Sequence, residues 1–157
     1  MRAYDKDIRR ELSKDDELDY LALASDLGPD AIPALRDLVH DEVPRIAASA
    51  AYLAGLIAAP ASRQVVEEAV ESREAVVRVA AAATLPTLAG RDVTGMAKKL
   101  LLDDDVGVRA RAVRAAAWFD DQAIAERVRV IAADDPEPAL RELAARILAK
   151  MPSGTAS

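Results

Sequence analysis

A motif built around one arginine recurs four times along this chain of 157 residues. In each copy an aliphatic or small residue precedes the Arg, and an Ala follows it three positions later. The four arginines lie 33, 31 and 32 residues apart, and they are Arg45, Arg78, Arg109 and Arg141. A fixed period in this range is typical of chains that stack one supersecondary unit again and again. The repeat therefore predicts an array of similar units, each packed on its neighbours.

Shorter amphipathic stretches lie between the arginine motifs, at 30–40, 62–71, 92–102 and 121–133. Each begins with Asp or Ser, whose side-chain oxygen can cap the free N–H groups of a first helical turn. Apolar residues then recur at helical spacing, and no stretch shows the sustained two-residue alternation of a half-buried strand. We therefore expect an all-α fold, an α–α superhelix of about ten helices in five antiparallel pairs.

The chain is expected to be one repeat domain over residues 1–151. Its first helix pair, predicted at 4–13 and 15–26, lacks the arginine motif and is densely charged, as a capping unit over residues 1–27 should be. Residues 1–44 hold six basic and twelve acidic side chains, which account for the whole net charge of -6. The last helix is predicted from about 136 to 151, and residues 152–157 as a disordered tail.

This pattern resembles the HEAT repeats, in the short form named after phycobilisome lyases. The residues that carry the resemblance are 30–35, 43–45 and 102–109. Pro33 stands where the family often has a proline in its first helix, and Asp103 with Arg109 matches its Asp and Val-Arg pair. The resemblance covers about 28–151, although Ser72 replaces the Asp of its repeat. It implies that the second helix of each pair lines a concave surface. It also implies that the repeated Arg bonds the turn between helices, often through the Asp six positions earlier.

Positions two, five and nine residues after the repeated Arg share one helical face, because their spacings are three and four. Each of the four repeats contributes three residues to this face: Ala47, Ala50 and Ala54; Ala80, Ala83 and Thr87; Arg111, Arg114 and Trp118; and Leu143, Arg146 and Lys150. By the resemblance, a smooth alanine groove ends in a basic patch that bears a tryptophan. Trp and Arg are enriched at binding hot spots, so the predicted partner-binding residues are Arg111, Arg114, Trp118, Arg146 and Lys150. In the alternative interpretation Trp118 and Phe119 seal the junction between repeats and the arginines are merely solvated.

No pattern in the chain predicts a catalytic residue, a metal site or a cofactor. The acidic clusters at 15–17, 103–105 and 134–135 precede helices, where carboxylates cap the first turn, and no Glu closes a calcium loop. Cysteine is absent, and His40 is the one histidine. No serine elbow and no glycine-rich phosphate loop occurs.

The leading functional interpretation is a non-catalytic protein-binding module, a scaffold or adaptor that docks an acidic or helical segment of another protein on its concave surface. The negative net charge argues against nucleic acid as a partner. The longest uncharged run, 46–62, is 17 residues long and rich in Ala, so we expect no membrane span. The chain is expected to be a cytoplasmic monomer. Its bias toward Ala, Arg and Asp favours a bacterial source.

Two other classes of function stay open. Some HEAT-like proteins are enzymes, among them the bilin lyases and the alkylpurine DNA glycosylases, and the resemblance extends to them as well. The third class is a structural array that forms homo-oligomers through the uncharged region 46–62.

Overall fold

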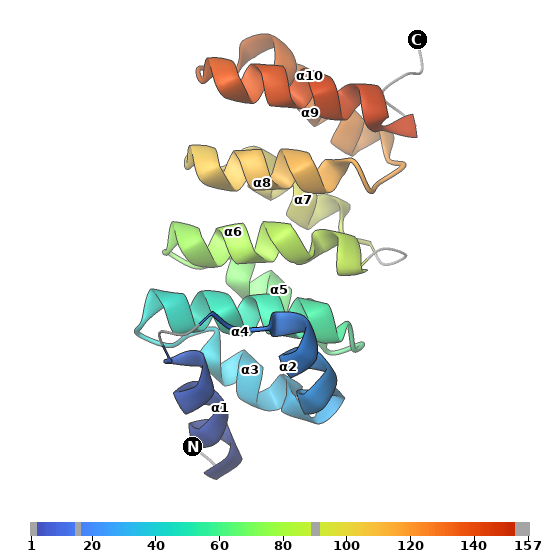
Figure 1. The fold of residues 1–157 in the computed structure, drawn as a ribbon. Coiled ribbons are helices and arrows are strands. Elements are labelled where there is room, and N and C mark those ends of the chain that lie inside the picture. Colours follow the sequence, from blue (N-terminus) through green and yellow to red (C-terminus); the bar gives the residue numbers. More distant parts are fainter. Residues whose placement is uncertain (1–2, 15–16, 89–91, 153–157) are drawn as a thin grey trace.

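The computed structural model describes residues 3–14, 17–88 and 92–152, and these residues form helices joined by short turns, with no strand among them (Figure 1). The α-helices are α1 (Ala3–Leu12), α2 (Tyr20–Leu27), α3 (Ile32–Leu38), α4 (Pro44–Ile57), α5 (Ser62–Val70), α6 (Ala75–Thr84), α7 (Thr94–Leu101), α8 (Val106–Ala116), α9 (Gln122–Asp134) and α10 (Pro138–Lys150). Short 3-10 helices, η1 (Pro29–Ala31) and η2 (Leu85–Leu88), precede α3 and follow α6. The predicted all-α fold is confirmed. Of the predicted tail, residues 153–157 lie outside the described residues.

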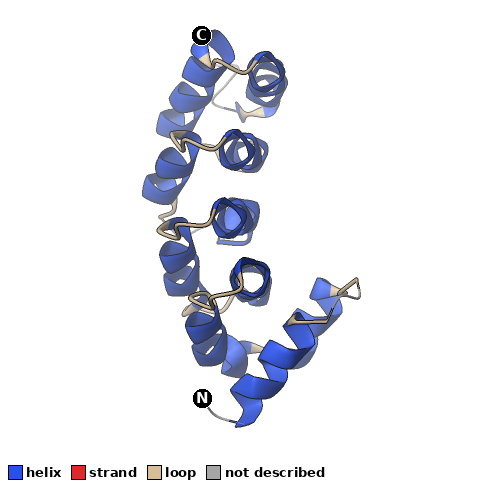
Figure 2. Cartoon of the chain, turned by 90° about the vertical axis from the view of Figure 1, so that its left-hand side faces the viewer, coloured by secondary structure: helices blue, strands red, loops and turns tan. Residues whose placement is uncertain are grey.

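The helices from α3 onward pack as successive pairs that stack along one direction. The even-numbered helices α4, α6, α8 and α10 each pack beside the next (Figure 1). In Figure 2 the stack forms an arc, with the odd-numbered helices along its outer edge and the even-numbered helices, seen end-on, on its inner side. The molecule is therefore an α–α superhelix whose concave surface is lined by the second helix of each pair, as predicted.

The first pair departs from this arrangement. Helix α2 begins at Tyr20, later than predicted, because the Asp19 carboxylate caps it by accepting a hydrogen bond from the Ala22 N–H at 3.0 Å. Helix α2 packs against α4. The Tyr20 ring meets the edge of the Tyr52 ring, with centroids 5.2 Å apart, and its hydroxyl lies 2.9 Å from Ser49 Oγ. An aromatic pair of this geometry adds about 0.5–1.5 kcal/mol beyond its buried area.

The alanine groove predicted on α4 is absent from the surface. Ala47, Ala50 and Ala54 are buried, with at most 2% of each exposed. Helix α4 is flanked by α2 on one side and α6 on the other, and alanine side chains let both approach closely. The prediction that these three alanines line an open groove is therefore wrong.

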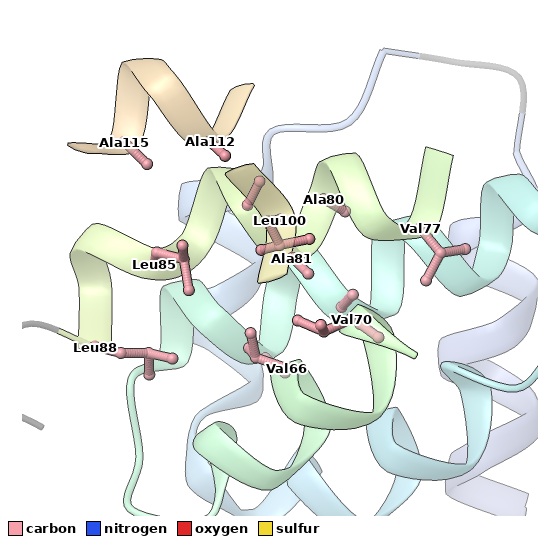
Figure 3. Packing of buried hydrophobic residues seen from close by; sticks show 14 of the residues in the cluster. Val66, Val70, Val77, Ala80, Ala81, Leu85, Leu88, Leu100, Ala112 and Ala115 are labelled. Carbon is pink, nitrogen blue, oxygen red and sulfur yellow. The ribbon is translucent and has the colours of Figure 1, made fainter. Parts of the chain in front are cut away.

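Small residues set the spacing of the inner helices. Figure 3 shows Ala80 and Ala81 on α6 and Ala112 and Ala115 on α8, with Val66 and Val70 of α5 below Ala81. Helices α4 and α6 approach closely, since a Cβ added to Gly55 would overlap Cβ and Cγ2 of Thr84. Interiors packed at this density tolerate no added methyl group without a shift of the backbone.

Paired hydrogen bonds from an arginine to an aspartate hold neighbouring repeats together. We call these contacts the clamps, and they join Arg9 to Asp41, Arg78 to Asp103 and Arg109 to Asp135. Arg109 Nη1 donates to the carbonyl oxygens of Asp103 and Asp104, at 2.9 and 3.0 Å, in the turn before its own helix. Its Nε and Nη2 donate to the two carboxylate oxygens of Asp135, at 2.9 and 3.2 Å, in the turn of the following repeat. Arg78 makes the equivalent bonds, with Asp103 as its carboxylate partner. The arginines thus have the structural role that the resemblance implied.

The carboxylate partner differs from the expected one. Arg78 and Arg109 each bond the backbone carbonyl of the residue six positions earlier, and their carboxylate partners come from the next repeat, 25 or 26 residues later. At the start of the array Arg9 of α1 takes this role and bonds Asp41 at 2.7 and 3.2 Å. Arg45 donates to backbone carbonyls at the end of α1, including that of Ser13 at 3.0 Å. The clamps therefore run from α1 to the last repeat.

The clamps make stability depend on pH. Burial acts to raise the pKa of Asp135, but hydrogen bonds from Arg109 and the Glu137 N–H outweigh it, so the pKa lies below the usual 3.8. The pKa values of Asp41 and Asp103 are lowered in the same way. A carboxyl group whose pKa is lowered by folding stabilises the native state above its unfolded pKa, and loses that effect as the pH falls through its folded pKa.

We therefore expect the free energy of unfolding to fall steadily below about pH 5. Urea unfolding followed by circular dichroism between pH 7 and pH 2.5 measures this loss. Asp135→Asn carries no titrating group at this position, so the difference in stability between it and the wild type should shrink as the pH falls. A difference that stays constant over the whole range would contradict the account of the clamp.

No helix in the described ranges is both long enough and apolar enough to cross a lipid bilayer.

Candidate functional site

Three of the predicted site residues lie together on the concave side of α8. The Asp105 carboxylate caps this helix by accepting from the Val108 N–H at 2.9 Å, which sets the register of the turns that follow. Val108, Ala112 and Ala116 are buried against the core, and Arg111 and Arg114 lie on the face of α8 that is turned away from it. Both arginines are exposed. Trp118 follows two residues after the helix ends, and 74% of it is exposed.

A shallow groove of about 170 Å³ connects these side chains to the preceding repeat. Its lining consists of Ala83, Pro86, Arg111, Arg114, Ala115 and Trp118. Phe119 packs against the core, whereas its neighbour Trp118 turns to solvent. The interpretation in which Trp118 seals the junction between repeats is therefore wrong. The groove places two guanidinium groups and an indole around a floor of small residues.

The two remaining predicted residues do not line this groove. Arg146 and Lys150 lie on α10, the next inner helix, and both are exposed. Helix α10 packs beside α8, so these cations add positive charge to the same side of the array. The structure thus joins three of the five predicted residues in one groove and leaves two at its margin.

Arg111 and Arg114 differ from the clamp arginines in that their side chains have no partner within the described part of the chain, a property they share with Arg10, Arg73 and Arg146. Arg78 and Arg109 hold carboxylates in the clamps, and Arg63 and Arg129 pair with glutamates on their own helices. The guanidinium groups of Arg111 and Arg114 make neither hydrogen bonds nor ion pairs with any described residue. A guanidinium presents a planar fork of donors that matches a carboxylate or phosphate, and its face stacks on aromatic rings. The patch can therefore hold an anionic group beside an apolar one.

A second concave groove, which sequence reasoning missed, lies between α4 and α6. It encloses about 670 Å³, and its lining is mostly apolar: Tyr20, Val43, Pro44, Arg45, Ala48, Ser49, Tyr52, Val76 and Ala80. Tyr20 reaches it only because α2 turns onto α4, a contact that no periodic pattern predicts. The pair of tyrosines in an otherwise aromatic-poor chain was the one available signal.

A larger hollow, of about 970 Å³, lies among α3, α5 and α7 and is strongly acidic. Its charges are partly compensated, since Glu68 accepts from Arg36 Nε and contacts His40 Nε2, both at 2.7 Å, and Lys99 pairs with Glu71. Burial acts to raise the pKa of Glu68, but the His40 and Arg36 hydrogen bonds lower it on balance. These pairs join successive outer helices, which is a structural role.

The acidic clusters stabilise the turns between helices by accepting hydrogen bonds. Asp103 accepts from the Asp105 N–H at 2.9 Å as well as from Arg78, and Asp135 accepts from the Glu137 N–H at 3.0 Å. Asp15 and Asp16 lie outside the described residues. Within the described ones, no three His, Asp or Glu side chains gather as ligands for a metal ion.

Comparison with models of known protein families and with curated proteins finds no match to this chain. The geometry of the concave surface is therefore the basis for assigning a function.

Proposed function

We propose that this chain is a HEAT-like repeat protein without catalytic activity, which binds an acidic segment of another protein on its concave surface. Arg111, Arg114 and Trp118 form the contact, and Arg146 with Lys150 extends the positive charge. The observation that carries the proposal is the pair of exposed guanidinium groups that have no partner in the described chain and flank an exposed tryptophan. The proposal includes a bacterial, cytoplasmic setting, which rests on composition alone.

The energetics favour a small contact of this kind. Exposed ion pairs contribute little by themselves, about 0–1 kcal/mol. A partner that covers Trp118 also removes water from the arginines beside it, and in such a site single Trp or Arg residues contribute about 2 kcal/mol or more. Arg78 and Arg109, in contrast, use Nε, Nη1 and Nη2 in bonds within the array.

A peptide-display selection against the wild-type chain tests this proposal. We expect the selected peptides to be rich in Asp and Glu beside apolar residues. Arg111→Glu/Arg114→Glu should weaken their binding at least thirtyfold, which corresponds to about 2 kcal/mol. The matched control is Arg73→Glu/Lys98→Glu, which changes the net charge equally at exposed positions outside this groove.

Circular dichroism checks that both variants stay helical. Equal binding by the wild type and Arg111→Glu/Arg114→Glu would refute the proposal. So would a selection that returns no acidic peptides, or a single-stranded DNA of the same length that binds more tightly than they do.

A further inference from the structure

The apolar groove beside the tyrosines adjoins the basic groove across one turn of α6. Ala80 lines the first groove and Ala83 lines the second. Residues three apart on a helix have Cβ atoms about 5–6 Å from one another. Residues 80–83 are all alanine, so no long side chain of α6 separates the two grooves. They form one concave strip, which runs from α4 over α6 to α8.

The two ends of this strip have different chemistry. At the α4 end, 53% of Val76 and 37% of Val43 are exposed beside Tyr52, and no carboxylate lines the groove. The hydrogen bond between the hydroxyl groups of Tyr20 and Ser49 and the edge contact with Tyr52 hold this wall in place before any partner binds. At the α8 end stand the two guanidinium groups and the indole. A matching partner has large apolar side chains at one end and carboxylates at the other.

The strip also restricts the backbone of its partner. It is built from the side chains of helices, whose backbone groups bond within each helix, and the described residues include no strand edge to which an extended peptide could add. A helical partner satisfies its own backbone and needs only side-chain contacts.

The strip spans two intervals between neighbouring inner helices. At about 8–10 Å per interval it is about 20 Å long. A helix of about 13 residues, or nearly four turns, covers this length.

We infer that the partner segment is an amphipathic α-helix of about four turns that crosses α6. Its apolar end occupies the groove of Tyr20, Tyr52 and Val76, and its carboxylates lie over Arg111 and Arg114. The complementary charge of the unpaired arginines sets its orientation along the strip. This inference rests on the proposed function and specifies the partner that the same surface takes.

Two synthetic peptides of about 18 residues, held helical by side-chain staples and labelled for fluorescence anisotropy, test the inference. In the first, a Glu pair and a Phe–Leu pair lie three turns apart on one face. In the second, the same residues are arranged so that the two pairs lie on opposite faces. We expect the first peptide to bind at least tenfold more tightly than the second.

The variant Val76→Glu should weaken the first peptide at least tenfold, since it puts a carboxylate into the apolar groove. Val76 is exposed in the first turn of α6, where a Glu suits the helix dipole, so the variant should fold normally. Leu102→Glu is the control, because Leu102 is similarly exposed, at 58%, but lines neither concave groove. It should change the affinity less than twofold.

The outcomes separate the two proposals. If Arg111→Glu/Arg114→Glu weakens the first peptide and Val76→Glu does not, the acidic contact stands and the spanning helix is refuted. If neither variant weakens it, both proposals fail. Equal binding by an unstapled, proline-rich peptide of the same charge would refute the helical partner.

Discussion

Replacing Gly55 with alanine should lower the free energy of unfolding by about 3 kcal/mol, at the upper end of the usual cost of overpacking a core. The added Cβ would overlap Cβ and Cγ2 of Thr84 on the neighbouring helix. Thr84 cannot move aside, because its side chain is fully buried and its Oγ1 donates to the Ala81 carbonyl at 2.9 Å. Helices α4 and α6 must therefore separate, and the alanines between them lose contact.

Urea unfolding of four variants measures this effect: Gly55→Ala, Gly95→Ala, Thr84→Gly and Gly55→Ala/Thr84→Gly. Gly95→Ala is the matched control, since nothing lies within 4 Å of the added Cβ and the change stabilises a helix by up to about 1 kcal/mol. In Gly55→Ala/Thr84→Gly the space returns, so the double variant should lose clearly less stability than the sum of the two single changes. Additive losses, or a Gly55→Ala variant as stable as the wild type, would contradict the close approach of these helices.

Replacing Arg109 with alanine should cost a similar amount, about 3 kcal/mol, because it leaves a buried charge without its partner. Only 5% of the Asp135 side chain is exposed, and both of its carboxylate oxygens accept from Arg109. The carbonyls of Asp103 and Asp104 lose their donor as well. The change therefore removes the contact between the last repeat and the one before it.

The control is Arg63→Ala, which breaks an ion pair of more exposed groups with Glu67 on the same helix. Such a pair contributes about 0.3–0.5 kcal/mol. Hydrogen exchange should also show faster opening of α9 and α10 in Arg109→Ala, because stability in a repeat array is carried by contacts between neighbours. If the two alanine variants lost equal stability, the clamp would not be a structural element of the array.

Much of this architecture could be predicted from local patterns. The spacing of Arg45, Arg78, Arg109 and Arg141 indicates that similar units stack on one another. Helices occur at each of the predicted stretches. The link from Arg to Asp was assigned to the wrong repeat, because a carboxylate six positions earlier and one 25 positions later are equally consistent with a period near 32. Only the fold shows which of them the guanidinium reaches.

The two helices of the first pair were predicted, but their packing could not be, because the pair lies outside the repeat. No period predicts that α2 turns onto α4, so the burial of Ala47 and the tyrosine groove both escaped sequence reasoning. Trp118 and Phe119 posed a related difficulty. They are adjacent at the end of a helix, and a shift of one residue in the helix end decides which ring packs against the core. The arginines were easier to assign, because their spacing from the clamp residue sets their face.

The sole tryptophan of the chain gives the most direct test of the central claim, that the concave side of α8 is the binding surface. Trp118 is 74% exposed, so its emission should be that of a solvated indole in the free protein. Titration with an acidic peptide selected on the wild type, with binding followed independently by calorimetry, should shift this emission to shorter wavelength and protect it from acrylamide quenching. Binding that saturates in the calorimeter while the emission and quenching of Trp118 stay unchanged would contradict the claim.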